Sequence, residues 1–409
     1  MSSTNVNSDN HVVVSGMRAT GALHLGHYHG VIKNWEKLQH EYDCYFFVAD
    51  WHALTTHYNS PEAIEKIAWE MVITWLSAGL NPGSCHIFIQ SHIPEHAELH
   101  LLLSMITPLS WLERVPTYKD QQEKLKELDL STYGFLGYPL LQTADVLAYK
   151  AGYVPVGEDQ ISHLELSREI ARRFNYIYGR ESDYEAKAEQ AIKNLNKKSA
   201  KLYLDAHRSY QETGDENALA KGRAIVNDLI SLSLGDKERL LGYLEGIGKI
   251  ILPEPQALFT PVSKLTGLDG QKMSKSYNNT IGLLEDPEQI NSKIKVMPTD
   301  PARVRRTDPG EPEKCPVWGL HQVYSNEGQK EWVKTGCRTA GIGCLECKKV
   351  LSECIISEQE PMLAKSLEYR SNTRLVREII REGTDAARSL ARETLTEVRD
   401  AIGLSYKDM

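Results

Sequence analysis

The sequence lacks any uninterrupted apolar run of roughly eighteen residues, the length that a membrane-spanning helix requires. Its first ten residues are polar and contain no apolar segment of the kind that marks a secretory signal peptide. We therefore expect a cytoplasmic protein that has no membrane partner. Positive charge is also in short supply, since the net charge is -8. A broad nonspecific coat of nucleic acid is thus excluded, and any RNA must be bound by local patches.

Cysteine is sparse, with seven residues in a chain of 409, and an odd number without an export signal argues against a disulfide framework. Cys44 and Cys85 each lie beside a predicted strand, so we expect both to be small core residues. Four others lie within one short segment: Cys315, Cys337, Cys344 and Cys347. The last two form a C-x-x-C pair, and the whole array predicts a thiolate-bound metal centre. Zinc and a four-iron four-sulfur cluster are both compatible, because each accepts four thiolates.

Strands and helices alternate along much of the chain, which predicts an α/β protein with a Rossmann-type, doubly wound parallel sheet. Apolar strand patterns occupy residues 12–14, 44–49, 87–90, 154–156 and 258–262. Residues 181–250 instead show amphipathic helical patterns and few strand signals, which predicts a helical insertion. We therefore expect three parts: a catalytic domain of residues 11–180 and 251–300, the helical insertion of residues 181–250, and an α-helical C-terminal domain of residues 301–409.

Two short motifs indicate a nucleotide site. The HLGH segment, residues 24–27, follows the first strand and a Gly-containing turn, at the start of a predicted helix. The unpaired N–H groups and positive dipole end of a helix start favour a phosphate. Far downstream, the KMSKS loop, residues 272–276, carries two lysines and two hydroxyls, as a mobile clamp on polyphosphate requires. The histidines alone would equally fit metal ligands or surface groups, whereas the two motifs together are specific.

Asp145 interrupts an otherwise apolar helical pattern over residues 137–149. A carboxylate is costly to bury unless hydrogen-bond donors surround it, so one interpretation is a salt bridge or an exposed face, and the other is a ligand contact. Indole has a single polar atom, an N–H donor, which an acceptor-only carboxylate complements. Asp159 follows the next predicted strand, where it can accept hydrogen bonds from ribose hydroxyls or cap a helix.

Basic residues gather in two helical regions. Lysines of the insertion are expected to form a solvated face rather than an RNA-binding surface. Near the C-terminus, four arginines at spacings of four, three and four predict one helical face: Arg370, Arg374, Arg377 and Arg381. We expect Gly383 to end that helix, and both a solvated face and an RNA contact remain open for the arginines.

Six segments together resemble the tryptophanyl-tRNA synthetases, a family of class I aminoacyl-tRNA synthetases: HLGH, DWHALT, YPLLQTAD, VPVGEDQ, KMSKS and DPARVRR. The cysteine array is similar to that of the bacterial iron–sulfur branch. The resemblance covers nearly the whole chain, except the first ten residues and the insertion. It implies a Rossmann-type core, a C-terminal domain that binds the tRNA anticodon, and a homodimer. The implied reaction activates L-tryptophan with ATP and Mg²⁺, releases pyrophosphate, and transfers tryptophan from the adenylate to tRNA(Trp).

The resemblance also implies roles for individual residues. Catalytic roles fall to His24, His27, Lys272 and Lys275. The ATP contacts are Arg18, Ala19, Thr20, Gly26, His27, Gly157, Glu158, Asp159, Gln160, Val262, Lys272, Met273, Ser274, Lys275 and Ser276. Tryptophan would be bound by Asp145, Tyr138, Gln142 and His52, although many relatives outside this branch have an apolar residue at the position of Gln142. The metal ligands would be Cys315, Cys337, Cys344 and Cys347, and the tRNA contacts Arg370, Arg374, Arg377 and Arg381.

Other functions fit parts of the sequence. A tyrosine-type synthetase, or an adenylyl or cytidylyl transferase, also places an H-x-G-H at a helix start. The complete KMSKS loop and the C-terminal arginines argue against a small-molecule transferase. A noncatalytic RNA-binding or redox-sensing protein could keep the same fold and cluster, but the intact HLGH segment and KMSKS loop argue against that alternative.

Overall fold

The computed structural model describes residues 11–116, 131–157, 160–180, 183–229, 232–259 and 265–406. Within these ranges, five parallel strands form a sheet in the order β3-β2-β1-β4-β5. The strands are β1 (Val12–Arg18), β2 (Asp43–Ala49), β3 (Cys85–Ile89), β4 (Tyr153–Val156) and β5 (Gln256–Phe259). The strand order reverses beside β1, which confirms the expected doubly wound sheet and places a ligand-binding crevice at the carboxyl ends of β1 and β4.

Strand β2 shows why the sheet is buried on both faces. Its side chains alternate between two hydrophobic clusters, with Phe46 and Val48 in one and Tyr45 and Phe47 in the other. An unbroken apolar run is what a parallel strand covered by helices on both sides requires. Cys44 pairs with Cys85 across β2 and β3, and both are buried, as expected for core residues.

Helices from distant parts of the chain complete the two clusters. The first contains residues of α1 (Leu25–His27), α2 (Lys33–Leu38), α4 (Ile64–Ser77), α14 (Pro287–Val296), α15 (Pro316–Tyr324) and α17 (Cys344–Ser371). The second contains residues of α5 (Glu95–Ser104), α6 (Leu109–Glu113), α8 (Tyr133–Leu147) and α9 (Ile161–Tyr178). Two further helices, α3 (Asp50–His57) and α16 (Glu327–Arg338), lie after β2 and between α15 and α17. No helix of the described ranges is long and apolar enough to cross a membrane.

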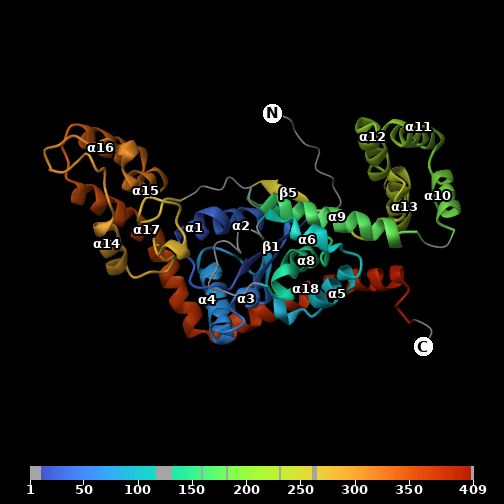
Figure 1. The fold of residues 1–409 in the computed structure, drawn as a ribbon, viewed down its shortest axis with the longest axis horizontal. Coiled ribbons are helices and arrows are strands. Elements are labelled where there is room, and N and C mark those ends of the chain that lie inside the picture. The colour runs from blue at the N-terminus through green and yellow to red at the C-terminus, as the bar shows by residue number, and fades with distance from the viewer. Residues whose placement is uncertain are drawn as a thin grey trace.

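The last helix, α18 (Thr373–Ile402), corrects one expectation. Gly383 does not end a helix; it lies in the middle of α18, where an added Cβ would collide with the backbone carbonyl of Ile87 in β3. Glycine is required because α18 runs directly against the sheet, beneath the strands in Figure 1. Apolar residues of α18 contribute to both hydrophobic clusters: Val376 belongs to the first and Leu395 to the second. The expected domain boundaries stay a prediction, but in its packing α18 belongs with the sheet.

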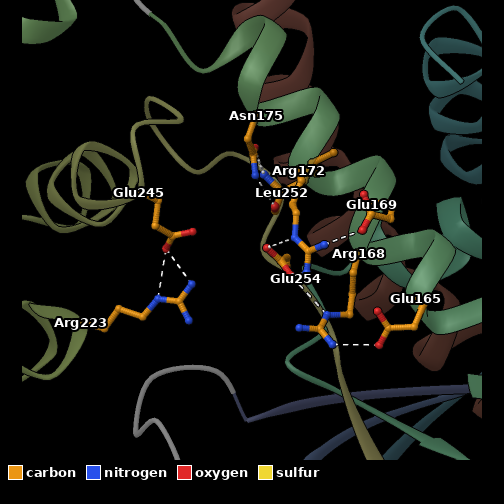
Figure 2. A network of polar contacts seen from close by, with 9 residues as sticks. All are labelled: Glu165, Arg168, Glu169, Arg172, Asn175, Arg223, Glu245, Leu252 and Glu254. Carbon is orange, nitrogen blue, oxygen red and sulfur yellow. Dashed lines mark hydrogen bonds and ion pairs between the residues drawn. The ribbon is translucent and has the colours of Figure 1, made fainter. Parts of the chain in front are cut away.

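The expected helical insertion is present as α10 (Tyr184–Lys193), α11 (Lys197–Thr213), α12 (Glu216–Asn227) and α13 (Leu234–Glu245). These helices share a hydrophobic cluster of their own and project beyond the end of α9 in Figure 1. Helix α9 binds the segment that returns from the insertion to the sheet. Asn175 forms hydrogen bonds with the backbone of Ile251 and Leu252. Arg172 pairs with Glu254 at 2.7 Å (Figure 2). The insertion therefore has a hydrophobic core of its own, and the chain that leaves it is attached to α9.

We predict that Gly383→Ala lowers the free energy of unfolding by about 1–3 kcal/mol, because the new methyl group would force α18 away from β3. Chemical denaturation followed by tryptophan fluorescence measures this change. Gly235→Ala in α13 is the control, since its methyl group would face open space and should be neutral or slightly stabilising. Equal stability of both variants would contradict the proposed close approach.

Candidate active site

The HLGH segment and the KMSKS loop lie side by side, although Lys275 and Gly21 are 254 positions apart. Lys275 Nζ donates to the carbonyl of Gly21 at 2.9 Å, and a Cβ added at Gly26 would lie 3.7 Å from Met273 Cβ. The backbone N–H of Leu25 also donates to Ile281 O at 3.0 Å. The predicted meeting of the two motifs is therefore confirmed, at the carboxyl end of β1.

Backbone contacts set the protonation of the two histidines. His24 Nδ1 accepts from the backbone N–H of Gly26, and His27 Nδ1 accepts from that of His24, each at 3.1 Å. A ring nitrogen that accepts carries no proton, so these contacts assign both protons to Nε2. Burial, followed by nearby Lys275, lowers the pKa of His24 to about 4, and burial, His24 and Lys275 lower the pKa of His27 to about 3. At neutral pH both imidazoles are therefore uncharged N–H donors.

The KMSKS loop is braced by a residue that the sequence analysis missed. Asn279 is buried, accepts from Ser274 N at 2.7 Å, and donates to Asp269 and to the carbonyl of Lys272. These bonds leave the Lys272 side chain exposed. Burial and the positive charge of Arg18 lower the pKa of Lys275 to about 8. Basic groups thus crowd this end of β1 and favour a polyanion.

Asp145 lies in α8 and is only 1% exposed. Oδ1 accepts from Gln90 Nε2 at 2.7 Å and from His96 Nδ1 at 2.5 Å, while Oδ2 accepts from His52 Nε2 at 2.8 Å. Burial alone would raise the pKa of this carboxyl, but hydrogen bonds from His52 and His96 outweigh it and hold the pKa well below its usual range. A carboxylate offers about four acceptor positions, so three donors leave room for one more.

Gln90 and His96 are site residues that the sequence did not reveal. Both are fully buried, and Gln90 Oε1 has no hydrogen-bond partner among the described residues. The apolar helical pattern of this segment begins only at Leu99 and does not extend to His96, whereas α5 starts at Glu95. Histidines at four-residue spacing, His96 and His100, were the available signal.

The remaining predicted pocket residues lie on α8 and in the β4–α9 turn. Gln142 Oε1 contacts His163 Nδ1 at 2.6 Å, and the Tyr138 ring lies against the same imidazole. Gln160 N donates to Gly157 O at 3.0 Å in the turn before α9. Three predicted ATP contacts, Glu158, Asp159 and Val262, lie outside the described residues, as does the side chain of Ser276.

The four cysteines lie around one corner of the C-terminal helices. Cys315 precedes α15, Cys337 lies in α16, and Cys344 and Cys347 open α17. Burial and the charges of the three other thiols raise the pKa of Cys347 to about 12. Within the part of the chain that is described, however, no three metal-binding side chains converge on a single ion.

A buried arginine faces the same cysteines. Arg303 Nη1 lies 3.7 Å from Cys337 Sγ, and its Nε is buried without a partner among the described residues. On the other side, α15 ends at Tyr324, whose hydroxyl lies 2.8 Å from His29 Nε2. His29 belongs to a π-helical turn, Tyr28–Ile32, directly after the HLGH segment. The cysteine corner is thus joined to the nucleotide motif through α15.

The arginine stripe crosses a helix boundary, because α17 ends at Ser371 and α18 begins at Thr373. Arg370 pairs with Glu70 of α4 at 2.9 Å, and Arg377 lies over the Trp69 ring at 5.9 Å. Periodicity alone did not predict this break. Part of the stripe therefore attaches α17 and α18 to α4.

A family model described as class I tRNA synthetases (W and Y) matches residues 7–193 and 236–358. The chain is 64% identical to a tryptophan–tRNA ligase of Ralstonia nicotianae, over 96% of this chain and 98% of that protein. It is 42% identical to a tryptophan–tRNA ligase of Thermotoga maritima, over 96% and 99% of the two chains. A tryptophanyl-tRNA synthetase from Campylobacter jejuni, crystallised with ADP and tryptophan, superimposes with a TM-score of 0.72 at 25% identity, covering 96% and 100%.

We predict that ATP affinity falls as the pH rises through about 8, because Lys275 then loses the positive charge that attracts phosphate. The dissociation constant of ATP, measured by equilibrium dialysis between pH 6.5 and 9.5, tests this prediction. In Lys275→Arg the guanidinium stays charged throughout, so the decline should disappear from that range. An unchanged decline in Lys275→Arg would assign the effect to another group.

Proposed function

Because the chain belongs to the class I tRNA synthetases for tryptophan and tyrosine, we propose that the described site carries out both steps of tRNA aminoacylation. The enzyme activates L-tryptophan with ATP, giving tryptophanyl-adenylate and pyrophosphate, and then transfers tryptophan to tRNA(Trp). The observation that carries the assignment of the residues is the buried Asp145 carboxylate, which accepts from three side chains.

The first step needs no enzyme nucleophile, because the tryptophan carboxylate itself attacks the α-phosphorus. Catalysis then rests on aligning the reactants and on stabilising charge at the phosphates. His24 and His27 supply neutral N–H donors, and Lys272 and Lys275 supply positive charge, helped by Mg²⁺ bound to the phosphates. Lys275 Nζ donates to Gly21 O close to the HLGH segment, and we expect phosphate oxygens of ATP to replace this contact.

The ATP site that we propose combines the end of β1, the HLGH segment, the β4–α9 turn and the KMSKS loop. It comprises Arg18, Ala19, Thr20, Gly26, His27, Gly157, Glu158, Asp159, Gln160, Val262, Lys272, Met273, Ser274, Lys275 and Ser276. The proposal is supported by the close approach of the KMSKS loop to the HLGH segment and to Gly21. Asp159 would accept from the ribose hydroxyls.

We infer tryptophan recognition from the acceptor position that three donors leave on the Asp145 carboxylate. The indole N–H takes the free acceptor position of Asp145, while His52 holds one carboxylate oxygen in place. Tyr138 and Gln142 shape the adjoining wall of the pocket. A site built to pair a substrate N–H rejects phenylalanine by about 10⁴–10⁵, so selectivity needs no editing step. Tyrosine would place its hydroxyl away from Asp145.

We further propose a four-iron four-sulfur cluster at Cys315, Cys337, Cys344 and Cys347. The residues fit a negatively charged group, since Arg303 Nη1 lies 3.7 Å from Cys337 Sγ and its buried Nε has no partner among the described residues. We propose the cluster rather than a single zinc because the cysteine array resembles that of the bacterial iron–sulfur branch, although four thiolates accept either group. When bound, the group would cross-link the starts of α15 and α17 to α16.

A cytoplasmic homodimer that binds tRNA completes the proposal. Four large apolar side chains within or next to α5, α6 and α8 are exposed: Leu101, Met105, Leu109 and Tyr133. Exposed apolar side chains of this kind are suited to contact a second copy of the chain. Among the stripe arginines, Arg370 and Arg377 contact α4. Arg381 pairs with Glu378 at 3.7 Å, so Arg374 is the more available for tRNA phosphates.

We predict that Asp145→Asn lowers kcat/KM for tryptophan in ATP–pyrophosphate exchange by about tenfold to a hundredfold, because hydrogen bonds to a charged acceptor contribute about 1.5–3 kcal/mol. The KM for ATP should stay within about twofold, since ATP does not contact this carboxylate. Near-normal exchange with tryptophan would remove Asp145 from the indole site.

We also predict that anaerobically purified protein is brown and contains about four irons per chain. Cys347→Ser should lose both the iron and the visible absorbance. Cys354→Ser is the matched control, because Cys354 lies in the same helix but outside the array, and it should keep both. A colourless protein that carries a single zinc would contradict the cluster.

A further inference from the structure

Two sets of ion pairs connect α18 to α5. At the first residue of α5, Glu95 is buried and accepts from Arg388 Nε at 2.9 and 3.1 Å and from Arg392 Nε at 2.9 Å. One turn further, Glu98 binds Arg399 through two contacts of 2.6 Å, and both side chains are partly exposed. The same two helices thus carry one cluster around a buried carboxylate, Glu95, whose arginine partners are partly exposed, and one surface ion pair.

The cluster around Glu95 lies next to the proposed tryptophan pocket. His96 follows Glu95 in the chain and is fully buried. Its Nδ1 contacts Asp145 Oδ1 at 2.5 Å and its Nε2 contacts the Tyr149 hydroxyl at 2.5 Å. Both ring nitrogens are therefore occupied, and the imidazole can hold the carboxylate only where the first turn of α5 places it. A displacement of that turn would move Asp145 or break the contact.

The first turn of α5 needs an external anchor. Pro94 occupies the N-cap position and provides no side-chain cap, so the usual local fixation of a helix start is missing. Glu95 suits the positive end of the helix dipole, but a buried carboxylate is unfavourable without paired donors. Those donors come from α18, which Gly383 brings directly against β3.

We propose that Glu95, held by Arg388 and Arg392, is a positioning residue for tryptophan selection: it fixes His96, which in turn orients Asp145. The C-terminal helix thereby acts on the amino-acid pocket indirectly, through Glu95 and His96. The proposal rests on the assignment of Asp145 to the indole N–H. It concerns affinity and selectivity for tryptophan, and it leaves the ATP contacts unaffected.

The test compares Glu95→Gln with Glu98→Gln, its matched control between the same two helices. In ATP–pyrophosphate exchange, Glu95→Gln should raise the KM for tryptophan about tenfold, less than the hundredfold that a 1 Å misplacement can cost. It should also reduce the preference for tryptophan over phenylalanine, with the KM for ATP within about twofold. Glu98→Gln should match the unaltered enzyme in all three quantities.

A milder variant and a double variant complete the test. Arg392→Gln leaves Arg388 in place and should give a smaller rise in the KM for tryptophan, which keeps the test valid if Glu95→Gln folds poorly. Adding Glu95→Gln to Asp145→Asn should cost less than the two separate effects combined, because both act on one carboxylate. Additive losses, or equal rises in the KM for tryptophan and for ATP, would overturn the positioning role. Near-normal exchange in Asp145→Asn would instead contradict the indole assignment itself.

Discussion

A carboxylate buried inside an α/β core must be surrounded by donors, and this constraint organises the pocket around Asp145. Its donors come from three elements that meet only in the folded protein: His52 from α3, Gln90 from the end of β3, and His96 from α5. Losing one donor would leave the charge under-compensated, at about 1–3 kcal/mol for a buried polar group and more for a charged one. Asp145, to which we propose that the indole N–H binds, is therefore also a structural junction, and the contacts that stabilise it determine which of its acceptor positions remains.

The proposed ATP site is dominated by positive rather than negative groups. Arg18 and Lys275 bring positive charge to a partly buried space, and the protein limits their repulsion by keeping His24 and His27 neutral. Backbone N–H groups fix each ring so that Nε2–H is the free donor. These donors are aligned before substrate arrives, which is the form in which electrostatic stabilisation costs no reorganisation during the reaction. A polyanion between the HLGH segment and the KMSKS loop relieves the remaining repulsion.

The sequence was sufficient wherever a local pattern carries the information. Parallel strands, the HLGH segment, the KMSKS loop and the acidic residue in an apolar helix all follow from residue order, and the structure brings them together. What it could not predict depends on tertiary contacts. Glycine is typical of helix ends, but Gly383 lies inside α18, where it allows the helix to pack closely against β3. His96 can contact Asp145 only because α5 begins at Glu95. Asn279 braces the KMSKS loop through hydrogen bonds within the same loop region. The break at Asn372 likewise depends on how α17 and α18 pack against α4.

The insertion shows how a class I core can carry extra helices without disturbing its chemistry. The family match omits residues 194–235, which lie in α11, α12 and the start of α13. The two ends of the insertion meet at a backbone hydrogen bond from Lys249 N to Gly179 O, so the added helices span a short distance. A loop whose ends are already adjacent costs little additional entropy as it lengthens. Asn175 and Arg172 then hold the returning chain just before β5 (Figure 2). Because these contacts are made outside the insertion, we expect the register of β5 to be independent of the arrangement of the inserted helices.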